Sequence, residues 1–90
     1  MRTAEDVLYA LQDAIDKKVD VLIAVDKERL MLKQQNTNGS LRVYEFQQNN
    51  ARIHAIERQI EGIEHDLRGL RIAEQIAENI ALGNNVLLQE

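Results

Sequence analysis

The strongest constraint on the fold is a run of branched aliphatic residues in the second half of the chain, spaced alternately by three and four. These residues are Ile53, Ile56, Ile60, Ile63, Leu67 and Leu70. Such spacing places them on one stripe of an α-helix, in the a/d pattern of a coiled-coil seam. Upstream the register reaches Asn49 and Phe46, and downstream it reaches Glu74, where an apolar residue is due.

Around Glu74 the apolar residues move to a shifted face, and this phase change predicts either a rotated seam or a bend. The residues on the shifted face are Ile72, Ala73, Ile76, Ala77, Ile80 and Ala81. Gly62 and Gly69 lie seven residues apart on the outer face, where each costs about 1 kcal/mol relative to alanine in a helix interior. They indicate local bending or the close approach of another helix.

These patterns predict a helix over residues 41–82. Ser40 is a suitable N-cap, and the chain has no proline that would break the helix. Gly83, followed by two asparagines, is a stop signal, so residues 83–90 form a short tail.

The first part of the chain predicts another helix, over residues 4–35, with Thr3 as its N-cap. Its apolar face consists of Leu8, Leu11, Ile15, Leu22, Val25 and Leu32. Lys18 and Arg29 interrupt this face. Residues 19–25 are apolar almost all round, which predicts contact with more than one neighbour. The turn-forming sequence Asn-Thr-Asn-Gly-Ser predicts a loop over residues 36–40.

Residues 19–46 also allow another interpretation. Val19, Val21, Ile23 and Val25 are β-branched at a period of two, which fits a strand. The segments on either side of Asn-Thr-Asn-Gly fit a β-hairpin. We favour the helix because residues 26–33 are rich in strong helix formers.

Composition restricts the class of protein. A chain of 90 residues forms a single domain, residues 1–90. The lack of cysteine excludes disulfides and thiolate metal sites and fits a cytoplasmic protein. A net charge of −4 argues against nucleic acid as a partner. No apolar run approaches the roughly 20 residues that span a bilayer, and the N-terminus does not have the pattern of a signal peptide.

The two predicted helices form an all-α fold, a long antiparallel helical hairpin with a coiled-coil seam. Two helices of this length cannot cover their own apolar faces. We therefore expect hairpins to pack as an oligomeric helix bundle, either a four-helix dimer or a larger ring. The heptad residues are the expected oligomer seam, and a further protein partner is also expected.

No constellation of side chains predicts a catalytic, cofactor or metal site. His54 and His65 are about 16 Å apart along a helix axis, too far to share a metal ion within one chain. Glu61 and His65 are i,i+4 neighbours that could form a general-base pair, but no nucleophile or third ligand accompanies them. The sequence therefore predicts a protein that is not an enzyme and needs no cofactor.

Asn49, at a core position of the heptad, favours a role in setting helix register. The alternative is an amide-lined pocket between helices. Such a pocket would hold a small anion near Arg29, Gln48, Asn49 and Arg52, because arginine suits carboxylate and phosphate groups.

Short segments of the chain resemble the all-helical chorismate mutases. These segments are residues 11–16, Glu28-Arg29, Val43-Tyr44-Glu45 and residues 76–89. The resemblance implies a helical fold and a cluster of cationic and polar side chains that holds a dicarboxylate. Only Arg29 matches that cluster, and the departures are Gln12, Gln48, Asn49, Ile80 and Asn84. Without those charges the resemblance implies a degenerate relative at most.

We therefore expect a non-enzymatic helical assembly, adaptor or inhibitor protein that acts through protein–protein contacts, as many small phage and mobile-element products do. The alternative function is an oligomer that sequesters a small anion.

Overall fold

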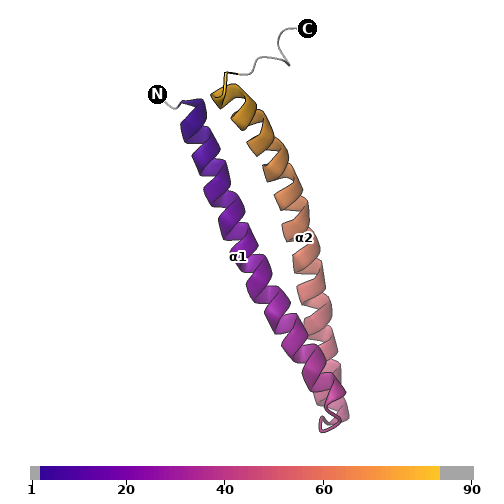
Figure 1. Cartoon of the computed structure of the whole chain (residues 1–90). Helices are drawn as coiled ribbons and strands as arrows, with labels where there is room; N and C mark the ends of the chain where they lie inside the picture. Colours follow the sequence, from indigo (N-terminus) through magenta and orange to yellow (C-terminus); the bar gives the residue numbers. More distant parts are fainter. Residues whose placement is uncertain (1–2, 84–90) are drawn as a thin grey trace.

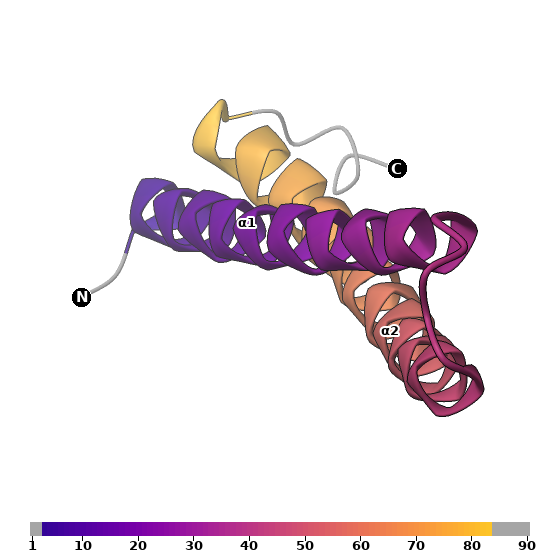
Figure 2. The same cartoon turned by 90° about the horizontal axis from the view of Figure 1, so that it is seen from below.

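The computed structural model describes residues 3–83 as two long antiparallel helices, α1 (Ala4–Thr37) and α2 (Val43–Ala81) (Figure 1). The ends of the described chain lie together at one end of the molecule, and the connection over residues 38–42 lies at the other. Residues 3–83 contain no strand, so the predicted all-α hairpin is confirmed and the strand interpretation of residues 19–46 is wrong. Seen from below, the two helices cross along their length (Figure 2).

Local hydrogen bonds explain where each helix begins. At α1 the prediction is confirmed, because Thr3 Oγ1 accepts from the Asp6 N–H and Asp6 Oδ2 accepts from the Thr3 N–H, both at 3.2 Å. At α2 the prediction of Ser40 as N-cap is wrong. The cap is Arg42, whose N–H donates to Glu45 Oε1 at 3.2 Å, so the helix starts two residues later than expected.

The connection between the helices is correspondingly displaced. The first helix continues to Thr37, beyond the expected end at residue 35, and the turn therefore covers residues 38–42 instead of 36–40. Gly39 takes a φ of +75°, a left-handed conformation that costs other residues more than glycine. Gly83 takes a φ of +70° after the last turn of α2. The rest of the expected tail, residues 84–90, lies outside the described residues.

The heptad residues of α2 lie between the two helices of the same chain. Four of them, Ile53, Ile56, Ile63 and Leu67, are buried, while Ile60 and Leu70 are half-buried. Ile63 and Leu67 form a core with Ile15 of α1, against which Val19, Leu22, Val25 and Leu70 also pack. The residues expected at an oligomer seam therefore already face a helix of their own chain.

The expected change of the apolar face around Glu74 is wrong. Ala77 is buried and Ala81 is half-buried, so the seam keeps its original register on these two alanines. Ile72, Ile76 and Ile80 instead stand outside it, with 64%, 47% and 54% of their surface exposed. The physical reason is that α1 offers one face to α2, and this face follows the register set by residues 53–70.

The apolar segment of residues 19–25 is covered on one side only. Val19, Leu22 and Val25 pack against the core, whereas Val21 and Ile23 are exposed. The molecule is a rod with extents of 63, 25 and 18 Å. A helix with the length and apolarity needed to cross a bilayer is not found among the described residues.

Candidate functional site

The cations that interrupt the apolar face of α1 are held by carboxylates. Lys18 Nζ lies 2.9 Å from Asp66 Oδ2 on α2. Arg29 donates to Asp26 Oδ1 at 2.6 and 2.9 Å and lies 3.9 Å from Glu57 Oε2 across the seam. Both cations therefore pair with carboxylates of α2, so they belong to the contact between the two helices of the hairpin.

Amide side chains form a second polar group near the turn. Asn36 Nδ2 donates to Asn50 Oδ1 at 3.0 Å, and Asn49 Nδ2 lies 3.2 Å from both Asn36 Oδ1 and Gln35 Oε1. These bonds join the last turn of α1 to the first turns of α2. They are compatible with the predicted role of Asn49 in helix register, which stays a prediction.

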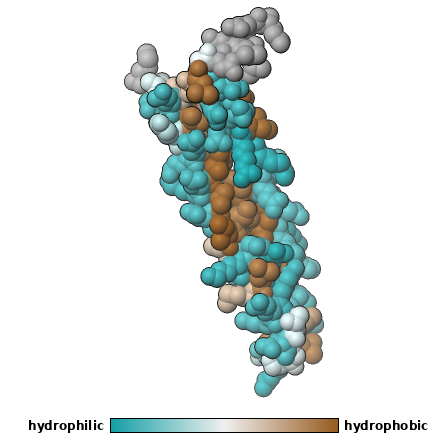
Figure 3. Space-filling model, in the orientation of Figure 1, coloured by the Kyte–Doolittle hydropathy of each residue, from teal (hydrophilic) through white to brown (hydrophobic). Residues whose placement is uncertain are grey.

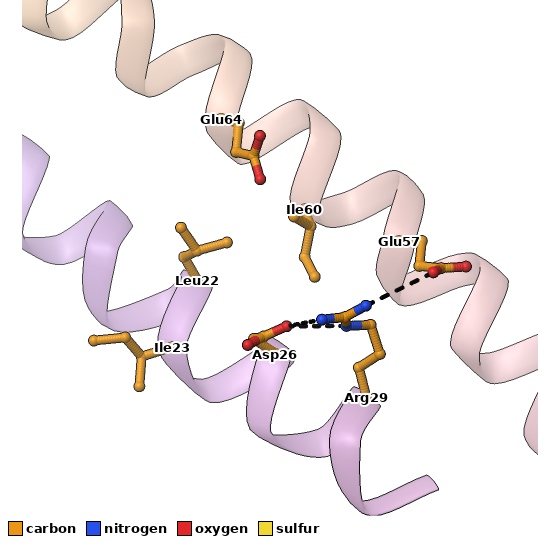
Figure 4. Close-up of a pocket in the computed structure, with 7 residues that line it drawn as sticks. All are labelled: Leu22, Ile23, Asp26, Arg29, Glu57, Ile60 and Glu64. Carbon is orange, nitrogen blue, oxygen red and sulfur yellow. Dashed lines mark hydrogen bonds and ion pairs between the residues drawn. The ribbon is translucent and has the colours of Figure 1, made fainter. Parts of the chain in front are cut away.

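Arg29 lines a hollow of about 480 Å³ beside the seam, shown in Figure 4. Its other lining residues are Leu22, Ile23, Asp26, Glu57, Ile60 and Glu64. Three carboxylates and one guanidinium give it a formal charge of −2, and Arg29 is already bonded to two of the carboxylates. A site of this charge repels an anion.

The other three residues of the predicted anion pocket lie elsewhere. Arg52 Nε and Nη2 donate to the two carboxylate oxygens of Glu28, each at 2.9 Å. Asn49 belongs to the amide group near the turn, and Gln48 is exposed. The structure therefore does not bring these residues into one pocket with Arg29.

The Arg52–Glu28 and Lys18–Asp66 bonds shift the titration of their acids. The hydrogen bond from Arg52 holds the pKa of Glu28 below its ordinary value of 4.5, and the pKa of Arg52 is raised in turn. The hydrogen bond from Lys18, with the attraction of its charge, holds the pKa of Asp66 below 3.8. These acids are ionised at neutral pH, so both bridges are charged.

The two histidines lie in separate surface hollows. His54 lines one with Asn50 and Glu57, and His65 lines another with Lys18 and Asp66. Within residues 3–83, no three histidine or acidic side chains are grouped closely enough to hold a metal ion.

Another hollow lies on the opposite side of the seam. It has a volume of about 440 Å³ over the seam residue Ile63, and its other lining residues are Ala14, Lys17, Lys18, Val21 and Gln59. The hollow formed by Lys18, His65, Asp66, Gly69 and Leu70 adjoins it, because Lys18 lines both. This continuous surface follows one long edge of the hairpin.

Sequence reasoning missed the carboxylate partners Asp26, Glu57 and Asp66. The sequence contained a signal for Asp26, because Arg29 follows it by three residues on the same helix. The pairs with Glu57 and Asp66 depend on the register between the two helices, which the sequence does not give directly. No protein-family model, curated protein or solved structure matches the chain.

Proposed function

We propose that the protein is a subunit of a homo-oligomeric helical assembly and acts through protein–protein contacts. The observation that carries this proposal is the amount of surface that a single hairpin leaves uncovered. Among the described residues the buried hydrophobic core consists of Ile15, Ile53, Ile56, Ile63, Leu67 and Ala77. More large hydrophobic side chains are exposed than buried, on both helices and near the turn.

The exposed area can be compared with that of ordinary monomers. The chain exposes 7018 Å², whereas a folded monomer of 10.3 kDa exposes about 5350 Å². The nine residues outside the described range, about 1 kDa, would contribute about 1450 Å² if wholly exposed, and a folded monomer of the remaining mass, about 9.3 kDa, exposes about 4970 Å². About 600 Å² remains beyond these two contributions, which is of the order of the roughly 800 Å² that each partner buries in an interface of standard size.

The kind of surface also supports an interface. Figure 3 shows apolar side chains along the groove between the helices, uncovered on this face and flanked by hydrophilic residues. Large exposed apolar patches with polar rims mark protein interaction sites. The anion-binding alternative has less support, because Arg29 would have to exchange Asp26 and Glu57 for a ligand within an acidic hollow.

Sedimentation velocity and light scattering after size exclusion test the proposal directly. The expected mass is a multiple of 10.3 kDa at micromolar concentration, and it should fall on dilution together with the thermal midpoint. A chain that stays monomeric, helical and cooperatively folded throughout would show that the uncovered surface needs no partner.

A further inference from the structure

One long edge of the hairpin carries small and aliphatic residues on both helices, and we call it the apolar edge. On α1 it consists of Val7, Ala10, Ala14, Val21 and Ala24. On α2 it consists of Gly62, Gly69, Ala73, Ile76 and Ile80. Within each set, the residues are separated by three, four or seven positions, so they share one side of the helix that extends from the border of the seam to the outer face.

This edge differs from the one on the other side of the seam. There, successive positions of α2 seven residues apart are Glu57, Glu64, Arg71 and Glu78. That edge therefore carries three carboxylates and one guanidinium along α2, and it is more highly charged than the apolar edge. On the apolar edge the charged residues Lys17 and Asp66 are already paired, with Asp13 and Lys18 respectively, each at 2.9 Å.

The glycines have no explanation within one hairpin. A Cβ atom added at Gly62 or at Gly69 would meet nothing within 4 Å, and neither residue has positive φ. Glycine lowers the intrinsic stability of a helix interior. The exposed Ile76 follows Gly69 by seven residues on the same face, so two small residues are followed by one large residue along it.

We propose that a second copy of the chain covers the apolar edge, running antiparallel, with Ile76 of each copy packed against Gly62 of the other. This inference rests on the proposed homo-oligomer and specifies its interface. Ile76 and Gly62 are each seven residues from Gly69. A two-fold axis at Gly69 therefore brings both isoleucines against glycines at once, as an isologous interface requires.

The first helix obeys the same symmetry. Val7 pairs with Ala24, and Ala10 with Val21, about a centre between residues 15 and 16. The Lys18–Asp66 bond sets Lys18 opposite Asp66 in the hairpin, which places residue 15 opposite Gly69. The centre on α1 and the centre on α2 thus lie at the same level of the hairpin, so a single two-fold axis can pass through both. In each α1 pair a valine of one copy faces an alanine of the other.

The charges fit this arrangement. About the same centre, Lys17 of each copy comes beside Asp13 of the other, so opposite charges meet at the rim. A second copy of the same chain is therefore the occupant that the sizes of the facing residues and the rim charges favour.

Two substitutions test the interface, and each has a matched control in the full-length chain. Gly69→Leu fills the symmetry axis, while Ala51→Leu enlarges an exposed position of α2 beyond the overlap. Ile76→Glu places a charge in the interface, while Ile23→Glu does so at an exposed isoleucine on the other side of the hairpin. Each Leu variant should keep its helix content, because leucine is a better helix former than glycine and only slightly poorer than alanine.

The readouts are mass by sedimentation and the dissociation constant by dilution. We expect a wild-type dimer of 20.6 kDa, twice 10.3 kDa. Both interface variants should raise the dissociation constant by at least about 30-fold, as substitution of an interface hot spot does, and both controls should keep it within about threefold. A Gly69→Cys variant should also form an intermolecular disulfide on oxidation, since the chain has no cysteine of its own.

The outcomes separate the two proposals. A monomeric wild-type protein contradicts both. An oligomer that the two interface variants leave intact, or that Ile23→Glu dissociates instead, overturns the inferred interface and leaves the proposed assembly standing. An oligomer that dissociates in both interface variants and persists in both controls supports both proposals.

Discussion

Replacement of Ile56 by alanine probes the seam at its most protected point. Ile56 is fully buried, with 0% of its surface exposed. The change removes three carbon atoms, worth about 2.4 kcal/mol of transfer free energy at about 0.8 kcal/mol each. The cavity that remains between two long helices adds to this, and the total expected loss is about 3–4 kcal/mol, within the range for buried isoleucine.

Such a loss is large for a chain of this size. About 0.05–0.15 kcal/mol per residue corresponds to a total of roughly 4.5–13.5 kcal/mol over 90 residues. Each kcal/mol moves the midpoint of a domain of this length by about 4–8 °C. Ile56→Ala should therefore lower the thermal midpoint by at least about 12 °C.

The assay is thermal and urea unfolding followed by far-ultraviolet circular dichroism at one fixed protein concentration, since an oligomer's midpoint depends on concentration. Ile23→Ala is the matched control, because Ile23 is 61% exposed and such positions change stability by about 0.5 kcal/mol or less. Equal losses in the two variants, or none in Ile56→Ala, would refute the assignment of the seam.

The remaining predictions concern charge, capping and the turn. Because Lys18 lowers the pKa of Asp66 below 3.8, ionised Asp66 favours the folded state above that pH, and the benefit is lost as the pH falls through the lowered pKa. The midpoint of the wild-type protein should thus fall more steeply below about pH 4 than that of Asp66→Asn, and parallel acid curves would contradict this. Thr3→Ala removes the acceptor for the Asp6 N–H and should cost about 0.5–2 kcal/mol in urea unfolding, whereas an unchanged midpoint would mean that the cap contributes nothing. Gly39→Ala must hold a φ of +75° and should cost about 1–2 kcal/mol, and a rise in the midpoint would show that the turn relaxes.

Much of the polar architecture depends on the relation between the helices. The cations Lys18 and Arg29 look like defects in an apolar stripe when α1 is considered alone. Across the seam they meet Asp66 and Glu57, 48 and 28 residues away in the sequence. The candidate interface has the same origin, because its two halves lie on one edge only in this antiparallel register.

The sequence alone determined the two helices, their order and the principal seam. It did so because spacings of three and four, the Thr3 cap and the absence of proline act within a few residues of one another. The predicted start of α2 was wrong because Ser40 is the more typical N-cap residue in the sequence. The actual cap is Arg42, whose backbone N–H donates to the side chain of Glu45.

Only the tertiary structure decided which apolar residues are covered. Ala77 is buried and Ile76 exposed, although isoleucine gains more from burial. The face that turns inward is set collectively by the packing of residues 53–70 against α1, and a single residue beyond them cannot rotate a continuous helix. The packing of residues 53–70 therefore also determines which apolar side chains stay exposed, and these side chains include the candidate interface.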